Sequence, residues 1–139
     1  MIRFVPIFVL QIICLEVYMT AAELRYLIAI NDLYDGTVGV KLTEIAVKTG
    51  VTKVSVYRAV ERLEKSEHVK RNEKNKVVMT EKGIRELSEY MVIVNFIRNQ
   101  LEFHCGTPEE IAFQDALGAA AALSDISRRH VVSLTEGLL

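Results

Sequence analysis

The chain has 139 residues and a formal net charge of −1; half of its residues are hydrophobic and a quarter are charged. With only two prolines and seven glycines, the composition favours a helix-rich globular protein and excludes a disordered or low-complexity chain. The two cysteines make no disulfide framework, which points to a reducing cytosol rather than a secreted, disulfide-stapled domain. A chain of this length holds one compact unit with an extension.

The charge is unevenly distributed along the chain. Residues 41–86 contain 12 Lys and Arg against 7 Glu, a net charge of +5, so the remainder, with 5 basic and 11 acidic residues, carries −6. A basic middle between acidic flanks is typical of a module that meets a polyanion with one part only. A solvated charged surface is the alternative that charge alone leaves open.

The first 18 residues, MIRFVPIFVLQIICLEVY, are mostly apolar, but Gln11 and Glu16 interrupt them. The uninterrupted apolar run is well below the roughly 20 residues that a membrane-spanning helix needs, so we expect no membrane anchor. Met19 is followed by TAAELRYLIAI, which suits the start of an amphipathic helix and favours a start codon assigned too early. A short apolar extension packed on a partner, a signal peptide and a membrane-attached sensor using residues 4–18 stay open.

The stretch LTEIAVKTGVTKVSVYRAVERLEKSE, residues 42–67, predicts a helix-turn-helix. Thr43 is expected to cap the first helix and Thr52 the second, and Gly50 supplies the backbone freedom that the turn needs. The buried face of the second helix is predicted from three apolar residues at helical spacing, Val56, Val60 and Leu63. An ordinary helical hairpin is the alternative interpretation.

The outer face of this second helix carries side chains that can reach DNA. Recognition helices read base edges with their amino-terminal residues and hold phosphates with neighbouring basic, hydroxyl and amide groups. The candidates for base contacts are Thr52, Lys53, Ser55 and Tyr57. The candidates for phosphate contacts are Arg58 and Arg62.

The stretch HVKRNEKNKVVMT, residues 68–80, predicts a two-stranded wing. Its strands are expected at residues 69–71 and 76–79, with a polar turn at residues 72–75. A hairpin there can lie along the sugar-phosphate backbone, where each Lys or Arg contact displaces condensed counterions. A solvated hairpin without a ligand is the alternative. The wing candidates for DNA binding are Lys70, Arg71, Lys74, Asn75 and Lys76.

Two further helices follow the wing. Thr80 is expected to cap a long helix whose apolar stripe, too long to be buried by so small a domain, predicts packing on another subunit. The stripe comprises Ile84, Leu87, Met91, Val94, Ile97 and Leu101. TPEE at residues 107–110 predicts a capping box with Pro108 in the first helical turn. ALGAAAAL at residues 116–123 has small residues on every face, so a second copy can approach closely; packing within the chain is the alternative.

The order of these segments resembles a known family. A capped first helix, LTEIAVKTGVTKVSVYRAVERLEKSEHV, a wing, MTEKG, a long helix and a GTPEE...LSD helix are similar to the diphtheria-toxin-repressor family of iron- and manganese-dependent transcriptional repressors, over residues 20–132. The resemblance implies a homodimeric winged-helix repressor. It also implies that the carboxyl-terminal helices form the dimer interface and, with the first helix, hold the activating metal.

The metal ligands of that family do not carry over to this chain. The matching positions on the first and long helices are Arg25, Ile28 and Val94, those on the later helix are Leu117, Ala120 and Ala121, and those of the ancillary site are Arg98 and Phe113. Iron and manganese need imidazole, carboxylate or thiolate donors, which these side chains do not offer. The adjacent His104 and Cys105 make a poor chelate by themselves. We therefore expect no metal and no cofactor, and no nucleophile and base stand at diagnostic spacing for catalysis.

Taken together, these patterns predict a mainly α protein with a small β-hairpin, a winged helix-turn-helix followed by a helical dimerisation region. The expected parts are an apolar leader (residues 1–18), a DNA-binding domain (19–86) and a dimerisation region (87–139). We expect a cytoplasmic homodimer that binds double-stranded DNA and represses transcription without a metal, and no enzymatic activity. A regulator of the multiple-antibiotic-resistance type that responds to a small ligand, and a winged helix used only for protein interaction, stay open.

Overall fold

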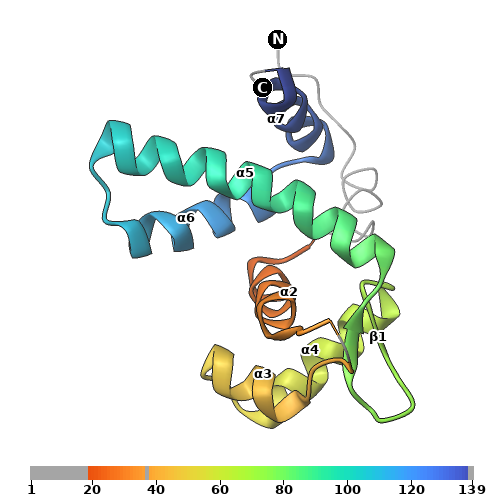
Figure 1. Cartoon of the computed structure of the whole chain (residues 1–139). Helices are drawn as coiled ribbons and strands as arrows, with labels where there is room; N and C mark the ends of the chain where they lie inside the picture. Colours follow the sequence, from red (N-terminus) through yellow and green to blue (C-terminus); the bar gives the residue numbers. More distant parts are fainter. Residues whose placement is uncertain (1–18, 37, 138–139) are drawn as a thin grey trace, which may run out of the picture.

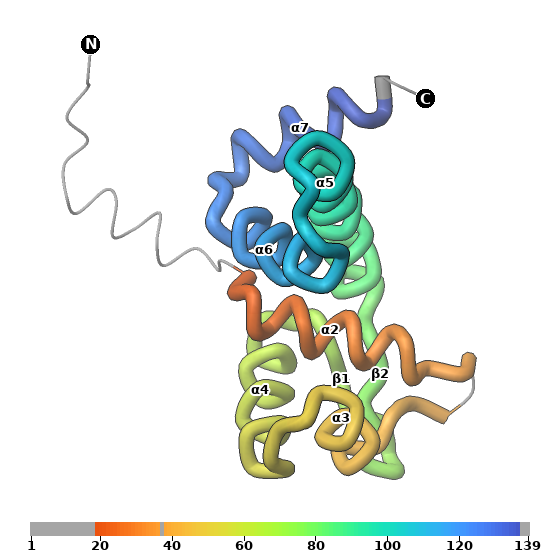
Figure 2. Tube along the Cα trace, turned by 90° about the vertical axis from the view of Figure 1, so that its left-hand side faces the viewer, coloured from red at the N-terminus to blue at the C-terminus, as the bar shows by residue number. Residues whose placement is uncertain are grey.

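The computed structural model describes residues 19–36 and 38–137, so the expectations for residues 1–18 lie outside it. The elements are α2 (Ala21–Leu33), α3 (Leu42–Thr49), α4 (Lys53–Lys65), β1 (Val69–Arg71), β2 (Val77–Met79), α5 (Glu81–Cys105), α6 (Glu109–Ala122) and α7 (Asp125–Gly137). Helices α3 and α4 and the hairpin gather in one half of the molecule, and α5 to α7 in the other (Figure 1; Figure 2). The predicted fold class is confirmed.

Helix α2 lies at the centre of the molecule. It begins with a capping box in which Thr20 Oγ1 accepts from the Glu23 N–H (3.1 Å) and a Glu23 carboxylate oxygen accepts from the Thr20 N–H (3.4 Å). Its apolar residues Leu24, Leu27 and Ile30 are fully buried, and the helix packs against α3, α4, α5 and α6. Figure 2 shows α2 between the two halves, so it joins both into one core.

Helices α3 and α4 form the predicted helix-turn-helix. Gly50 turns the chain with a left-handed backbone (φ 71°), and Thr52 Oγ1 accepts from the Ser55 N–H at 3.2 Å, as a cap does. The predicted cap at Thr43 is wrong: the N-cap is Lys41, two residues earlier, α3 begins at Leu42, and a Glu44 carboxylate oxygen accepts from the Lys41 N–H at 3.0 Å. The reason lies outside the local sequence, because Val40 is held extended against β2 and the chain turns into the helix directly after it.

The wing is a two-stranded antiparallel hairpin in which Val69 pairs with Met79 and Arg71 with Val77. A third segment joins it: Val40 and Val77 exchange both backbone hydrogen bonds, at 2.9 and 2.8 Å. The second strand begins at Val77 rather than Lys76. The wing is therefore held by backbone hydrogen bonds to the segment before α3, in addition to the pairing of its own two strands.

Helix α5 is capped as predicted, since Thr80 Oγ1 accepts from the Gly83 N–H at 3.1 Å. Its buried face differs from the predicted stripe. Ile84 is 53% exposed, whereas Tyr90 and Ile93, outside the stripe, are buried together with Leu87 and Val94. The face is broader than one stripe because α6 and α7 of the same chain both pack on α5.

Helix α6 begins at Glu109, and its cap differs from the prediction. Pro108 occupies the N-cap position with an extended backbone, and no side chain caps the helix, so the capping box from Thr107 is wrong. Three small residues of α6, Ala112, Ala116 and Ala120, are buried together with Leu117. Because α6 packs on α5 and α2, this face serves packing within the chain. Among the helices that the structure describes, none is long and apolar enough to cross a membrane.

Candidate nucleic-acid interface

Helix α4 presents one face to the core and the other to solvent. Val56, Ala59 and Val60 are fully buried. The helical period places Ser55, Arg58 and Arg62 away from that face, and the other three predicted DNA-contacting residues lie in the first turns of the helix or at its cap. All six are exposed: Thr52, Lys53, Ser55, Tyr57, Arg58 and Arg62. The Thr52 and Ser55 hydroxyl oxygens are 2.9 Å apart at the first turn, and the exposed Lys53 lies between them in the sequence.

Val54 belongs to the same surface and was missed from the sequence. It is 60% exposed, which is a high value for a valine on a helix with a well-formed apolar face. Helical spacing could have found it, because position 54 lies about 200° around the helix from the buried Val56. An exposed methyl-bearing side chain between polar ones suits contact with the methyl group of thymine.

Arg71 is engaged inside the protein, between the wing and α4. Its Nε lies 2.8 Å from a carboxylate oxygen of Glu64, its guanidinium carbon lies 4.8 Å from the centre of the Tyr57 ring, and its side chain is only 17% exposed. An ion pair and a cation–π contact from one guanidinium fix β1 against α4. Arg62 differs: it lies 3.9 Å from Glu23, and its guanidinium stays largely open to solvent.

The tip of the wing is organised by the Asn72 side chain. Its Oδ1 accepts from the N–H groups of Lys74 and Lys76, both at 3.0 Å, and its Nδ2 donates to the Val38 carbonyl at 2.8 Å. Lys74 and Asn75 are exposed, and Asn75 has a left-handed backbone (φ 59°). The turn thus keeps its shape through the Asn72 amide, and the Lys74 and Lys76 side chains make no hydrogen bond or ion pair with the residues that the structure describes.

Replacing Lys74 and Lys76 together by alanine is expected to weaken DNA binding by a similar factor for every sequence. Each lost phosphate contact lowers the slope of log affinity against log salt by about 1, so the slope falls by about 2. Fluorescence anisotropy at several salt concentrations measures it. Glu73→Ala, at the same exposed tip, is the control for disturbance of the turn and should not lower affinity; an unchanged slope in the double variant would remove the wing from the interface.

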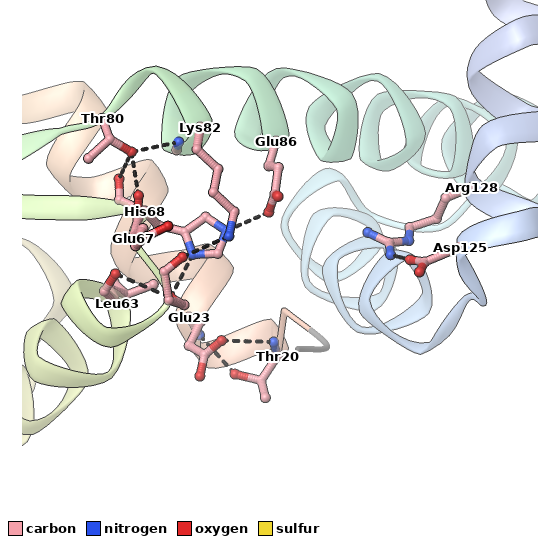
Figure 3. A network of polar contacts seen from close by, with 12 residues as sticks. Thr20, Glu23, Leu63, Glu67, His68, Thr80, Lys82, Glu86, Asp125 and Arg128 are labelled. Atoms are coloured by element: carbon pink, nitrogen blue, oxygen red, sulfur yellow. Dashed lines mark hydrogen bonds and ion pairs between the residues drawn. The ribbon is translucent and has the colours of Figure 1, made fainter. Parts of the chain in front are cut away.

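A buried histidine joins the recognition helix, the wing and α5. His68, 1% exposed, pairs through Nε2 with the Glu86 carboxylate, and its Nδ1 lies 2.6 Å from the Ser66 hydroxyl. Its carbonyl accepts from the Thr80 N–H at 3.0 Å and the Thr80 hydroxyl at 3.1 Å. Figure 3 shows Glu86 on α5 reaching the imidazole and Thr80 reaching the backbone. Sequence reasoning missed this junction.

The first turn of α5 lies directly on the backbone at His68. A methyl group at Gly83 would stand 2.1 Å from the His68 carbonyl oxygen, closer than any side chain can approach. Lys82 Nζ adds a hydrogen bond of 2.9 Å to the Ser66 carbonyl. The orientation of α5 relative to the wing is therefore fixed by close backbone contact and by charged hydrogen bonds.

The positions that match the metal ligands of the diphtheria-toxin-repressor family hold other chemistry. Val94, Leu117 and Ala120 are fully buried in the core. The two arginines there have partners on α6: Arg25 Nε donates to the Gln114 side chain at 2.9 Å, and the Arg98 guanidinium lies 5.9 Å from the centre of the Phe113 ring. Within residues 19–36 and 38–137, no group of three or more His, Cys, Asp or Glu could hold a metal ion. His104 and Cys105 are exposed at the end of α5.

Comparison with solved structures identifies the same fold in other proteins. The chain is similar to the crystal structure of the hypothetical protein SSo2273 from Sulfolobus solfataricus (TM-score 0.67, 21% identity, 84% of this chain and 88% of that one). It is also similar to T. acidophilum IdeR (TM-score 0.59, 20% identity), over 82% of this chain and 53% of that one. No protein-family model and no curated protein matches the sequence. At these identities the likeness is one of fold, and at that level the resemblance to the diphtheria-toxin-repressor family is confirmed.

Proposed function

We propose that the protein is a sequence-specific, double-stranded-DNA-binding transcriptional regulator that acts in the cytoplasm as a homodimeric repressor. The observation that carries the proposal is the exposed amino end of α4, with Lys53 and Arg58, beside a wing with the exposed Lys70 and Lys74. The +5 charge of residues 41–86 supports it, because phosphate contacts dominate affinity for DNA. The fold shared with IdeR supports the same assignment.

The roles within this surface follow from where each side chain lies. Thr52, Lys53, Ser55 and Tyr57 are proposed to face base edges in the major groove, with Val54 beside them, and Arg58 and Arg62 to face phosphates. In the wing, phosphate contact is assigned to Lys70, Lys74, Asn75 and Lys76. Arg71 is proposed as a positioning residue, because its guanidinium already contacts Glu64 and Tyr57.

Exposed apolar side chains on the α5–α7 half support dimer formation. Phe103 is 80% exposed, and Ile111, Ile126 and Leu134 each expose more than half of their surface. A dimer that reads two half-sites one turn of DNA apart needs its recognition helices about 34 Å apart. Sedimentation equilibrium should give twice the chain mass of 15.7 kDa; a monomer at micromolar concentration would contradict the dimer.

Repression without a metal and without catalysis is the second part of the proposal. It is supported by the buried alkyl groups of Val94, Leu117 and Ala120 where the resemblance implies ligands. Alkyl groups cannot coordinate iron or manganese. The proposed activity is DNA binding, without a metal and without a catalytic step.

The experiment that tests the proposed function is anisotropy with duplex DNA from upstream of the gene of this protein, first in chelator and then with added manganese or ferrous iron. Equal, strongly salt-dependent binding in all three conditions is expected. Binding only with metal would contradict metal independence while keeping DNA binding. Failure to bind any duplex at low salt would contradict the regulator itself and favour a protein-interaction module.

A further inference from the structure

A cleft of about 530 Å³ lies between α5 and α7, on the half of the molecule away from the candidate DNA interface. Its volume is in the range of small-molecule sites. Charged groups from both helices line it, together with the apolar side chains of Ile93 and Val132. The matched metal positions Val94, Leu117 and Ala120 are buried in the core and do not line it. The cleft is therefore a separate feature that the proposed DNA binding does not use.

Most charged groups in the cleft already have partners. Arg128 pairs with Asp125, and its guanidinium carbon lies 4.5 Å from the centre of the Tyr90 ring. Burial raises the pKa of Tyr90, although the nearby Arg128 charge acts in the opposite direction, so its hydroxyl stays protonated at neutral pH. Figure 3 shows Asp125 and Arg128 together, with Glu86 across from them on α5.

Two opposite charges in the cleft remain open. Glu89 on α5 and Arg129 on α7 line it, both are exposed, and neither side chain makes an ion pair or hydrogen bond with the described residues. A guanidinium is the preferred partner of a carboxylate, and a carboxylate is the natural partner of an ammonium group. A ligand with one positive charge, one negative charge and a short apolar part could contact Glu89, Arg129 and the apolar side chains of the cleft at the same time.

We propose that this cleft binds a small zwitterion, a free aliphatic α-amino acid. Arg129 binds its carboxylate, Glu89 binds its ammonium group, and Ile93 and Val132 contact its side chain. The site needs no metal and no covalent step.

The cleft is connected to the wing through one residue. Glu86 lines the cleft and is also the partner of the buried His68, which lies between α4 and β1. A ligand ammonium close to Glu86 competes with the imidazole for the same carboxylate. Occupancy of the cleft is therefore expected to change the environment of His68, and its effect on DNA affinity rests on the proposed function.

Isothermal titration of the full chain with alanine, valine, leucine, isoleucine and methionine tests the site. At least one of them is expected to bind with a Kd below about 1 mM, and if none does, the proposal is overturned. For leucine, the matched compounds are 4-methylpentanoate, which lacks the ammonium, and 3-methylbutylamine, which lacks the carboxylate; equivalent pairs serve for the others. Each should bind at least about tenfold more weakly, since a charged hydrogen bond is lost. Equal binding of either overturns the assignment to a zwitterion.

Variants locate the ligand in the cleft. Glu89→Gln and Arg129→Gln are each expected to weaken amino-acid binding about tenfold or more, for the same reason. Glu102→Gln, a matched change on α5 outside the cleft, should leave the Kd unchanged. Amino-acid binding that survives both cleft changes would place the ligand elsewhere and overturn the proposal.

The connection to His68 is measured without DNA. The imidazole nitrogen resonances of His68 in a ¹⁵N-labelled chain should shift on saturation with the amino acid, and unchanged resonances in the bound protein overturn the connection. Fluorescence anisotropy then measures the affinity for DNA with and without the amino acid. A protein that binds the amino acid but no DNA would contradict the proposed regulator and leave the cleft site standing, so the two failures are distinguishable.

Discussion

Replacing Gly83 by alanine is expected to destabilise the protein by roughly 3 kcal/mol, because the new methyl group overpacks a contact that has no room to relax. The atom that it meets is the His68 carbonyl oxygen, 2.1 Å away, and this oxygen is held in place by two hydrogen bonds from Thr80. The backbone of α5 at Gly83 and the backbone at His68 must therefore move apart. Urea unfolding followed by circular dichroism gives the change in free energy of unfolding.

A matched control exists in the same fold. Gly118 also lies inside a helix, but a methyl group there meets nothing within 4 Å. Gly118→Ala should therefore stabilise the chain by about 0.5–1 kcal/mol, through helix propensity alone. Opposite signs for the two substitutions would verify the close packing of α5 on the wing junction; a Gly83→Ala variant as stable as the parent protein would show that α5 does not pack there.

The double replacement of Lys53 and Arg58 by alanine on α4 is expected to reduce affinity for specific DNA about 100-fold or more. Each contact between a basic side chain and DNA contributes on the order of 1–3 kcal/mol, and the two residues lie apart on an exposed face with no ion pair among the described residues. Stability should barely change, because both side chains are exposed. Anisotropy with operator and random duplexes, at one fixed salt concentration, measures the loss.

The single variants separate the two roles on α4. Lys53→Ala should relax discrimination between operator and random DNA, whereas Arg58→Ala should weaken both equally. Arg25→Gln removes a positive charge from α2, where Arg25 contacts Gln114 of α6, and it serves as the control for net charge. If that control lost as much affinity as the α4 variants, binding would follow overall charge and not the recognition helix.

The helix-turn-helix could be predicted because its signals are local. Gly50 at the turn, the Thr52 cap and the buried faces at helical spacing depend on neighbours within a few residues. The cap of α3 was mispredicted because a distant segment determines where the helix begins. Thr43 is not the cap, since Val40 pairs with Val77, far along the sequence, and the helix starts soon after Val40. Local patterns cannot contain that information.

The same distinction applies to the candidate site. Exposed positions on α4 followed from the period of the helix, but the engagement of Arg71 with Glu64 and Tyr57 depends on how the wing folds back. The His68–Glu86 pair joins residues 18 apart across two elements, and nothing near His68 in the sequence marks it as buried. The pattern of charged residues in the sequence predicts which positions lie on the surface. Which residues of different helices and strands contact each other can be seen only in the tertiary structure.

Helix α5 has 25 residues and so spans about 37 Å, since an α-helix rises 1.5 Å per residue. It begins at the wing and ends in the exposed Phe103 region, so one rigid rod runs from the proposed nucleic-acid contact to the proposed contact between copies. In the proposed dimer, the length of that rod would set how far each wing stands from the two-fold axis. Operator spacing in this protein would then be encoded by the number of helical turns in α5 rather than by the residues that touch bases.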